Sequence, residues 1–537
     1  MSIFSIGISG LNTAQTALTT TSNNISNVYS PGYNRQVTQI SETLVGAGVG
    51  VTGVERQFNR FVADQLNRNN SVVNGLQTYQ AQVSQIDNLL ADGSSSLSTL
   101  MTSFFASLQD VASTPSDPAA RQGVLGAAGV LAGQFRSFAN YFDDMQSSVN
   151  AQVGDEISQV NNTASQLAKL NREITLAKAK SGEAPNGLLD QRDKLVSDLS
   201  KRLDIQLTVQ DGGTYNISLS NGFSLVSGTQ SFDLVAMRSS SDPARIGVGY
   251  KDGAGNQVEL NEASISGGSL GGLLTFRSEV LDKTQNQLGL MATSLAQSFN
   301  QQHAAGIDLN GNPGGDFFSI GQPRALSNTN NTGSGVMSAT ISDFSQLNGS
   351  DYDVSLDSSG QYKVVNHGTG EAVMASYDGT ANTLTFGGMT VQISGVPAAG
   401  DRFQIQPTRG AAQTLAVAIT DTAQIAAGSG GGSGDNSNVL ALQKLQTGKV
   451  VSGQASLSQA YAALVSDIGN SANITNANLS AQQGLNEQLS ALQQSDSGVN
   501  LNEEAANLIR FQQYYQANAK IIQVGSTVFD TLLGIQA

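Results

Sequence analysis

The chain has 537 residues, only 13% of them charged, and its 42 acidic and 27 basic side chains give a formal net charge of −15. This balance argues against nucleic acid and against an anionic membrane surface, because both are bound by patches of Lys and Arg. The absence of Cys excludes disulfides, thiolate metal sites and a Cys nucleophile, and two histidines argue against a zinc enzyme. We see no apolar run of about 18 residues that would span a membrane. No basic side chain precedes Arg35, so we expect no secretory signal peptide.

The first 34 residues contain no Asp, Glu, Lys or Arg and predict a helix. Its seam is a seven-residue repeat of Phe4, Leu11, Leu18 and Ile25, with small or apolar companions at Gly7, Ala14, Thr21 and Val28. We expect the helix to end near residues 27–29.

A turn should follow, because Pro31 disfavours helical geometry at Ser30 and Pro31-Gly32 suits the centre of a type II turn. Up to about Thr52 the chain should be extended or loop, broken by Gly46, Gly48 and Gly50.

Residues 53–202 and 270–303 have helical periodicity. We predict helices within 53–110, with a break at residues 92–96, and a turn with a helix start at 114–118. A long helix should then run to about Lys180, with apolar residues spaced by four and three from Leu131 to Leu167. Such a helix needs antiparallel partners. Shorter helices are predicted at 188–202 and 270–303.

Two stretches, residues 203–266 and 335–407, change to a period of two and are punctuated by Gly, Asn and Asp. Each predicts a small antiparallel β domain inserted into a helical body. A flexible loop is expected at 428–434, and helical patterns resume from about Val439.

The last helix repeats the character of the first. Its predicted seam is Leu501, Leu508, Tyr515, Ile522 and Phe529, and beyond Lys520 the only charged side chain is Asp530. Two interpretations of these helices, whose polar faces are uncharged, stay open. They could be ordinary helices packed on one domain, or assembly elements whose outer faces also meet protein, where a charge would be costly to desolvate.

The predicted fold class is therefore α+β and multidomain: an elongated molecule with an antiparallel α-helical coiled-coil stem, a helical body and inserted antiparallel β domains. The predicted domains are 1–40 with 497–537, 41–202 with 267–334 and 408–496, 203–266, and 335–407.

We find no constellation of residues that predicts catalysis, a cofactor or a metal site. Residues 308–313 begin like a calcium loop, but an EF-hand needs Gly and Glu where Pro313 and Ser319 stand, so we predict a tight polar loop. His303 is interpreted as a cation at a helix end and His367 as part of a surface turn. Adjacent Glu503 and Glu504 are interpreted as complementing the dipole of the last helix.

Residues 22–36, with Asn23, Asn24, Pro31, Gly32 and Tyr33, resemble the signature of bacterial flagellar axial proteins, which include rod, hook and hook-associated proteins. Tyr29 and Ser30 depart mildly from it. Residues 507–520 are similar to the closing helix of that family. The ending 528–535, together with 270–277 and 299–303, resembles the hook-associated proteins of the first hook–filament junction.

The resemblance implies a non-enzymatic structural adapter, exported through the flagellar type III apparatus and located outside the cell. It implies a homo-oligomeric ring with hook protein below and a second hook-associated junction protein above, and an export chaperone at the C-terminal helix. The terminal helices would form a coiled pair in the inner tube. Two rival hypotheses are a secreted adhesin or binding module that acts through the β insertions, and a secreted hydrolase.

Overall fold

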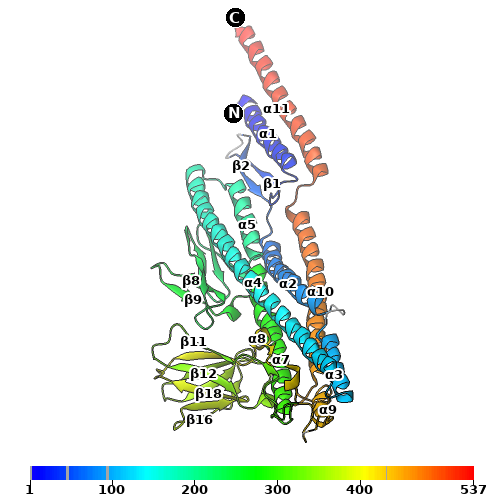
Figure 1. Cartoon of the computed structure of the whole chain (residues 1–537). Coiled ribbons are helices and arrows are strands. Elements are labelled where there is room, and N and C mark those ends of the chain that lie inside the picture. The colour runs from blue at the N-terminus through cyan, green and yellow to red at the C-terminus, as the bar shows by residue number, and fades with distance from the viewer. Residues whose placement is uncertain (1–2, 44–47, 92–95, 431, 537) are drawn as a thin grey trace.

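The computed structural model describes residues 3–43, 48–91, 96–430 and 432–536. The molecule is elongated, and both ends of the chain lie at one end of it (Figure 1). Below them runs a helical body, with strands gathered along one side. Residues 92–95 of the predicted break at 92–96 lie outside the described residues, as do Gly46 and Gly431.

The terminal helices are α1 (Ile3–Ser26) and α11 (Leu501–Gln536), which confirms both predicted terminal elements. The type II turn is also confirmed: the Tyr33 N–H donates to the Ser30 carbonyl at 3.1 Å, and Gly32 has a φ of 84°. A hairpin of β1 (Gln36–Glu42) and β2 (Val49–Arg56) follows and lies against α1.

The predicted start of the next helix at residue 53 is wrong. Residues 49–56 pair with β1, and α2 begins at Arg60, where the Asn59 side chain accepts the Val62 N–H. A long helix, α4, confirms the prediction of one ending near Lys180. Its cap residues are Asp117 and Gly182, and its buried stripe includes Leu131, Phe135 and Phe142. The helices of the body are α2 (Arg60–Leu90), α3 (Leu97–Ser113), α4 (Pro118–Ser181), α5 (Asn186–Ser200), α6 (Gly268–Phe276), α7 (Asp282–Ala304), α8 (Ala411–Thr414), α9 (Ser437–Lys444) and α10 (Leu457–Ser497).

A cluster of four fully buried phenylalanines closes one end of the body core. Phe299 of α7 lies 5.4 Å from Phe104 and 4.7 Å from Phe317, measured between ring centroids, and Phe318 lies 5.8 Å from Phe104. Phe318 belongs to the short pair β10 (Phe318–Ser319) and β20 (Ala416–Val417). These rings tie α3, α7 and the segment after α7 into one core.

The predicted helix at 270–303 is interrupted. A π-helical segment, Arg277–Leu281, separates α6 from α7. Hydrophobic periodicity misses such an insertion, because one extra residue in a single turn leaves the flanking apolar stripes intact.

We call residues 203–266 the inner β region. It contains two antiparallel sheets, and both pack on α4. Asn171 of α4 secures one of them, because its side chain donates to the Tyr215 and Gly228 carbonyls at 2.8 and 2.7 Å. The sheet order is β3-β4-β5-β6, then β7-β8-β9, with β3 (Ile205–Val209), β4 (Tyr215–Leu219), β5 (Ser224–Ser227), β6 (Gln230–Ser231), β7 (Leu234–Arg238), β8 (Ile246–Lys251) and β9 (Gln257–Glu259).

We call residues 324–407 the outer β region. The strands begin before the predicted residue 335, since β11 pairs with the returning β19. The sheet orders are β11-β19-β13-β14-β15 and β12-β18-β17-β16, with β11 (Arg324–Ser327), β12 (Val336–Ile341), β13 (Tyr352–Leu356), β14 (Tyr362–Asn366), β15 (Ala372–Val373), β16 (Ser376–Asp378), β17 (Thr383–Phe386), β18 (Met389–Ser394) and β19 (Arg402–Gln406).

The interpretation of His303 as a cation at a helix end is wrong. The ring is completely buried, lies 2.7 Å from the Gly315 carbonyl through Nδ1, and accepts the Ala426 N–H at 3.0 Å through Nε2. Burial lowers the pKa of His303, so the ring is neutral and joins two loops through its hydrogen bonds. His367 does lie in the turn after β14, with Nδ1 2.8 Å from Asp353 Oδ2.

The polar loop at Asp308 is confirmed, because this carboxylate accepts the N–H groups of Asn310 and Asn312 at 2.8 Å each. Across the described residues, no three His, Asp or Glu side chains are arranged to hold a metal ion. Among the described helices, none combines the length and hydropathy that crossing a bilayer requires.

Candidate assembly interface

The two terminal helices run antiparallel in a single register. Asn24 bonds to Glu504, Gly10 lies against Asn518, and Gly525 lies against Ile3. Each step of seven or fourteen residues along α1 is matched by an equal step along α11. The contact therefore extends along the whole described length of α1.

Small residues form the centre of this contact. A Cβ atom added at Gly10 would stand 2.1 Å from Asn518 Oδ1, and one added at Gly7 would stand 2.7 Å from Ile522 Cγ1. The helix backbones thus approach more closely than larger side chains would permit. The buried residues of α1 are Gly7, Gly10, Thr13, Ala14, Ala17, Thr20, Thr21 and Asn24.

The larger residues of the predicted N-terminal seam lie at the edge of the contact. Phe4, Leu11, Leu18 and Ile25 are half-buried, whereas their companions Gly7, Ala14 and Thr21 are buried. Close approach through Gly and Ala leaves no room for the larger side chains at the centre.

On α11 the contact is displaced by three residues from the predicted seam. Leu508 and Ile522 are half-buried, but Leu501, Tyr515 and Phe529 are 42%, 37% and 55% exposed. The buried positions are Glu504, Asn518 and Gly525. They are fourteen and seven residues apart, so they fit a seven-residue repeat that an apolar pattern does not detect.

A carboxylate clamp closes the far end of the pair. Glu504 is 1% exposed and accepts from Asn24 Nδ2 at 3.0 Å and Arg35 Nε at 2.8 Å. Arg35 also pairs with Glu503 at 2.9 Å. Sequence reasoning assigned these two carboxylates to the helix dipole and missed their common Arg partner, since 469 positions separate Arg35 from Glu504.

Asn24, in the last turn of α1, bonds through its side chain to the segment that follows the helix. Its side chain accepts the Gln36 N–H at 2.9 Å, donates to the Gln36 carbonyl at 2.8 Å, and accepts the Tyr33 hydroxyl at 2.8 Å. Asn23 and Pro31 are exposed. Burial, reinforced by the charges of Asp190 and Glu504, raises the pKa of Tyr33 to about 12. The Tyr33 hydroxyl is therefore a protonated donor at neutral pH.

Charged contacts join this turn and hairpin to the helical body. Asn34 Nδ2 donates to Asp190 Oδ1 at 2.6 Å, and Arg56 pairs with Asp190 at 2.9 Å and with Asp193 at 2.6 Å. The Arg35 N–H donates to the Ser497 carbonyl at 2.8 Å. The terminal pair is thus attached to α5 and α10 by buried or half-buried polar groups.

Residues 526–536 of α11 continue past Ile3, the first described residue of α1 (Figure 1). Asp530 is the only charged side chain of this overhang. Its large apolar residues are exposed, as are three on α1. A run of exposed apolar side chains on a surface with so little charge is typical of an interaction site. These residues, with their exposed fractions, are Val528 54%, Phe529 55%, Leu532 59%, Leu533 54% and Ile535 76%, and on α1 Ile3 51%, Ile6 39% and Ile8 52%.

Comparison with known families covers most of the chain. Residues 83–318 match the flagellar hook-associated protein FlgK helical domain, and residues 326–407 match the flagellar hook-associated protein 1 D2-like domain. The ends match rod-protein models: residues 4–33 the flagella basal body rod protein, and residues 493–535 the flagellar basal body rod FlgEFG protein C-terminal.

Relatives that align over nearly their whole length are proteins of the same kind as these family models. The flagellar hook-associated protein 1 of Escherichia coli (strain K12) is 44% identical over 547 aligned residues, which cover 100% of both chains. That of Bacillus subtilis (strain 168) is 25% identical, over 97% of this chain and 96% of the relative. The solved flagellar hook junction protein FlgK from Burkholderia pseudomallei is 31% identical, with a TM-score of 0.76 over 80% of this chain and 100% of that one.

Proposed function

The chain belongs to the flagellar hook-associated protein 1 family, and we propose that it is an adapter whose terminal helices complete their packing only when subunits assemble. It is a structural protein of the hook–filament junction of the bacterial flagellum. The mechanism proposed is coupled folding and assembly, with no catalytic step. The terminal seams pair within a subunit, and the uncharged outer faces pack between subunits.

One observation carries this proposal: the terminal pair exposes large apolar side chains on a surface that is almost free of charge. Phe529, Leu532 and Leu533 of the overhang are each more than half exposed. Because the described residues of this chain leave these side chains exposed, the partner proposed to cover them is another chain. Covering such a face desolvates little charge, because Asp530 is the single charged side chain of the overhang.

The outer face of α10 supports lateral contacts between subunits in the same way. From Ile468 to Ser495 its only charged residue is Glu487. Ile474, Leu485 and Leu492 on that helix are 53%, 43% and 47% exposed. This face and the terminal pair belong to consecutive helices, so one neighbouring copy could contact both.

The partners proposed for the assembled state are a ring of identical subunits, hook protein below and the second hook-associated junction protein above. Before assembly, an export chaperone at the C-terminal helix would cover the apolar face of α11. Export through the flagellar type III apparatus would place the protein outside the cell. These assignments rest on the family and on the need to shield the terminal helices.

Incorporation of variants into hooks tests the proposal. Leu18→Asp and Leu508→Asp each place a charge at the edge of the pair, and we expect both to block incorporation while the β regions stay folded. In a strain lacking the native gene, these variants should leave hooks without filaments and release flagellin into the medium. Val396→Asp, at a residue 74% exposed in the outer β region, is the matched control and should restore filaments. Normal filaments with both seam variants would refute the proposal.

A further inference from the structure

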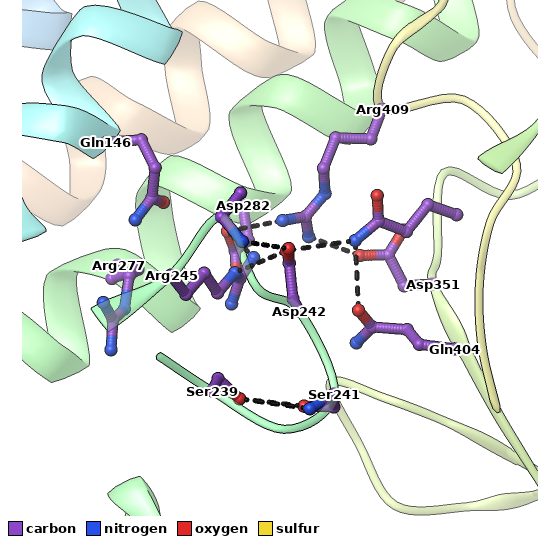
Figure 2. Close-up of polar contacts among 12 residues, drawn as sticks. Gln146, Ser239, Ser241, Asp242, Arg245, Arg277, Asp282, Asp351, Gln404 and Arg409 are labelled. Atoms are coloured by element: carbon purple, nitrogen blue, oxygen red, sulfur yellow. Dashed lines mark hydrogen bonds and ion pairs between the residues drawn. The ribbon is translucent and has the colours of Figure 1, made fainter. Parts of the chain in front are cut away.

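Asp282 joins three parts of the molecule that are distant in sequence. It lies in the first turn of α7, and its side chain is 8% exposed. Figure 2 shows its carboxylate between two guanidinium groups. Oδ1 of Asp282 lies 2.6 Å from Arg245 of the inner β region and 3.0 Å from Arg409, which follows the last strand of the outer β region.

The π-helical segment explains how α7 reaches the inner β region. The Asp282 N–H donates to the Arg277 carbonyl, five residues earlier, so these two residues stand about one turn apart on one face. Arg277 donates to the Ile246 carbonyl at 2.8 Å and pairs with Glu262 at 2.5 Å. Arg277 and Asp282 therefore hold the same β region from neighbouring positions.

Arg409 extends the connection to the outer β region. Besides Asp282, its guanidinium donates to Asp351, which directly precedes β13. Arg245 also pairs with Asp242 at 3.2 Å. The side chains of these five residues are no more than 12% exposed. Asp282 is the carboxylate bonded to both Arg245 and Arg409.

The charges identify Asp282 as the central anion of this cluster. Burial opposes ionisation, but Arg245 and Arg409 outweigh it and hold the pKa of Asp282 below its ordinary value. Burial, by contrast, raises the pKa of Asp351. Removing the charge of Asp282 would leave two guanidinium groups buried without their shared carboxylate, which a folded protein avoids by opening the site to water.

Apolar packing does not seal this joint. A cavity of about 340 Å³ lies beside the cluster, lined by apolar side chains such as Phe142 and Leu288 and by polar ones such as Gln146 and Arg324. Other contacts limit how far the outer β region could move. Asn328 bonds to Ser240 at 3.1 Å, and Ser452 donates to the Leu347 carbonyl at 2.6 Å.

We propose that Asp282 is a positioning residue that sets the orientation of the outer β region on the helical body. With the carboxylate in place, the joint has one arrangement. Without it, the outer β region samples several orientations around its remaining contacts. A fixed orientation suits a subunit that must present the same surface to every neighbour. The proposal itself does not depend on the junction role.

A distance measurement on the free monomer tests it. Because the chain has no Cys, spin labels can be placed through Met374→Cys, at a residue 96% exposed in the outer β region, and Val130→Cys, at a residue 58% exposed on α4. We expect one narrow distance distribution in the native background. Asp282→Asn should widen it at least twofold or add a second population. Asp198→Asn, which removes a half-exposed ion pair with Lys194 and Lys201, is the control and should change nothing.

A second variant keeps the test decisive if Asp282→Asn does not fold. Arg409→Gln removes the guanidinium that bonds to Asp282, Asn286 and Asp351, and it leaves Asp282 paired with Arg245. It should broaden the distribution while the helical circular dichroism signal stays native. An unchanged width in a folded Asp282→Asn or Arg409→Gln protein would overturn the proposal. Because the measurement uses monomer, failure of the assembly hypothesis would not affect it.

Discussion

The helical body and the terminal pair are both helical, yet they bury opposite kinds of residue. In the body, Phe104, Phe135 and Phe142 are fully buried. In the terminal pair, Gly10 and Asn518 form the contact and the large apolar residues remain outside. The body core is therefore complete within one chain, whereas the terminal pair leaves large apolar side chains exposed, which in our proposal other chains cover.

The energetic consequence follows from burial. Fully burying a large apolar side chain stabilises a structure by about 1.5–3 kcal/mol. In the body, each core phenylalanine contributes this stabilisation within the monomer. In our proposal, the overhang of α11 gains the same stabilisation only when subunits assemble. Stability of the monomer and strength of the assembly should thus respond to different substitutions.

The largest expected effect comes from the body core. Phe104→Ala empties a site surrounded by Phe299, Phe317 and Phe318, and we expect the free energy of unfolding to fall by about 3–5 kcal/mol. Phe529→Ala, in the exposed overhang, should change the free energy of unfolding by no more than about 0.5 kcal/mol. Chemical denaturation followed by circular dichroism measures both. Equal losses in the two variants would contradict the contrast between the regions.

A smaller effect is expected where the terminal helices approach most closely. Gly10→Ala places a methyl group against Asn518 and should cost about 1–3 kcal/mol locally. Amide exchange should accelerate in residues 3–26 and 501–525 but not in the body. Gly154→Ala is the matched control on α4. Its new methyl group meets no atom within 4 Å, so it should stabilise that helix by about 0.5–1 kcal/mol. Unchanged exchange in Gly10→Ala would mean that the helices are not in close contact in solution.

The two carboxylates that pair with Arg35 should differ in how much each stabilises the terminal pair. Glu504→Gln removes the buried acceptor of Arg35 and Asn24, and we expect a local loss of about 1–3 kcal/mol. Glu503→Gln alters a largely exposed partner of the same Arg35 and should cost less than about 1 kcal/mol. Amide exchange in α1 distinguishes them. Equal protection of the α1 amides in both variants would show that burial of Glu504 does not increase the stability of the terminal pair.

The smallest expected effect is on the pH dependence of stability, which should differ between the body, with His303, and the outer β region, with His367. Burial lowers the pKa of His303, whereas the bond to Asp353 raises that of His367. His303 should therefore contribute stability above pH 6.5 that is lost as the pH falls below this value. His367 should contribute stability below pH 6.5 that is lost as the pH rises through its raised pKa.

Proton NMR can resolve the two rings, because the chain has only two histidines. His303→Gln and His367→Gln assign the two resonances. We expect one ring to titrate below pH 6.5 and the other above it. Coincident titrations at pH 6.5 would show that neither environment persists in solution.

Local patterns were sufficient for most elements. The seven-residue apolar repeat, the Pro31-Gly32 turn and the stripe of α4 correctly predicted helices and a turn, because each depends on residues close in sequence. The period-two stretches predicted both β regions for the same reason. The start of α2 was wrong because strand pairing with β1 overrode the local helical pattern.

The sequence by itself determined most of the helical and strand segments, the scarcity of charge at both ends and the resemblance to flagellar axial proteins. Only the tertiary structure decided which face of α11 meets α1, because close approach depends on where Gly and Asn stand opposite each other in space. The tertiary structure was also needed to show that Glu504 pairs with Arg35 and that His303 is a buried neutral ring. It likewise showed that Asp282 lies between Arg245 and Arg409. Charge pairing and burial are properties of distance in the folded chain, and sequence spacing does not contain them.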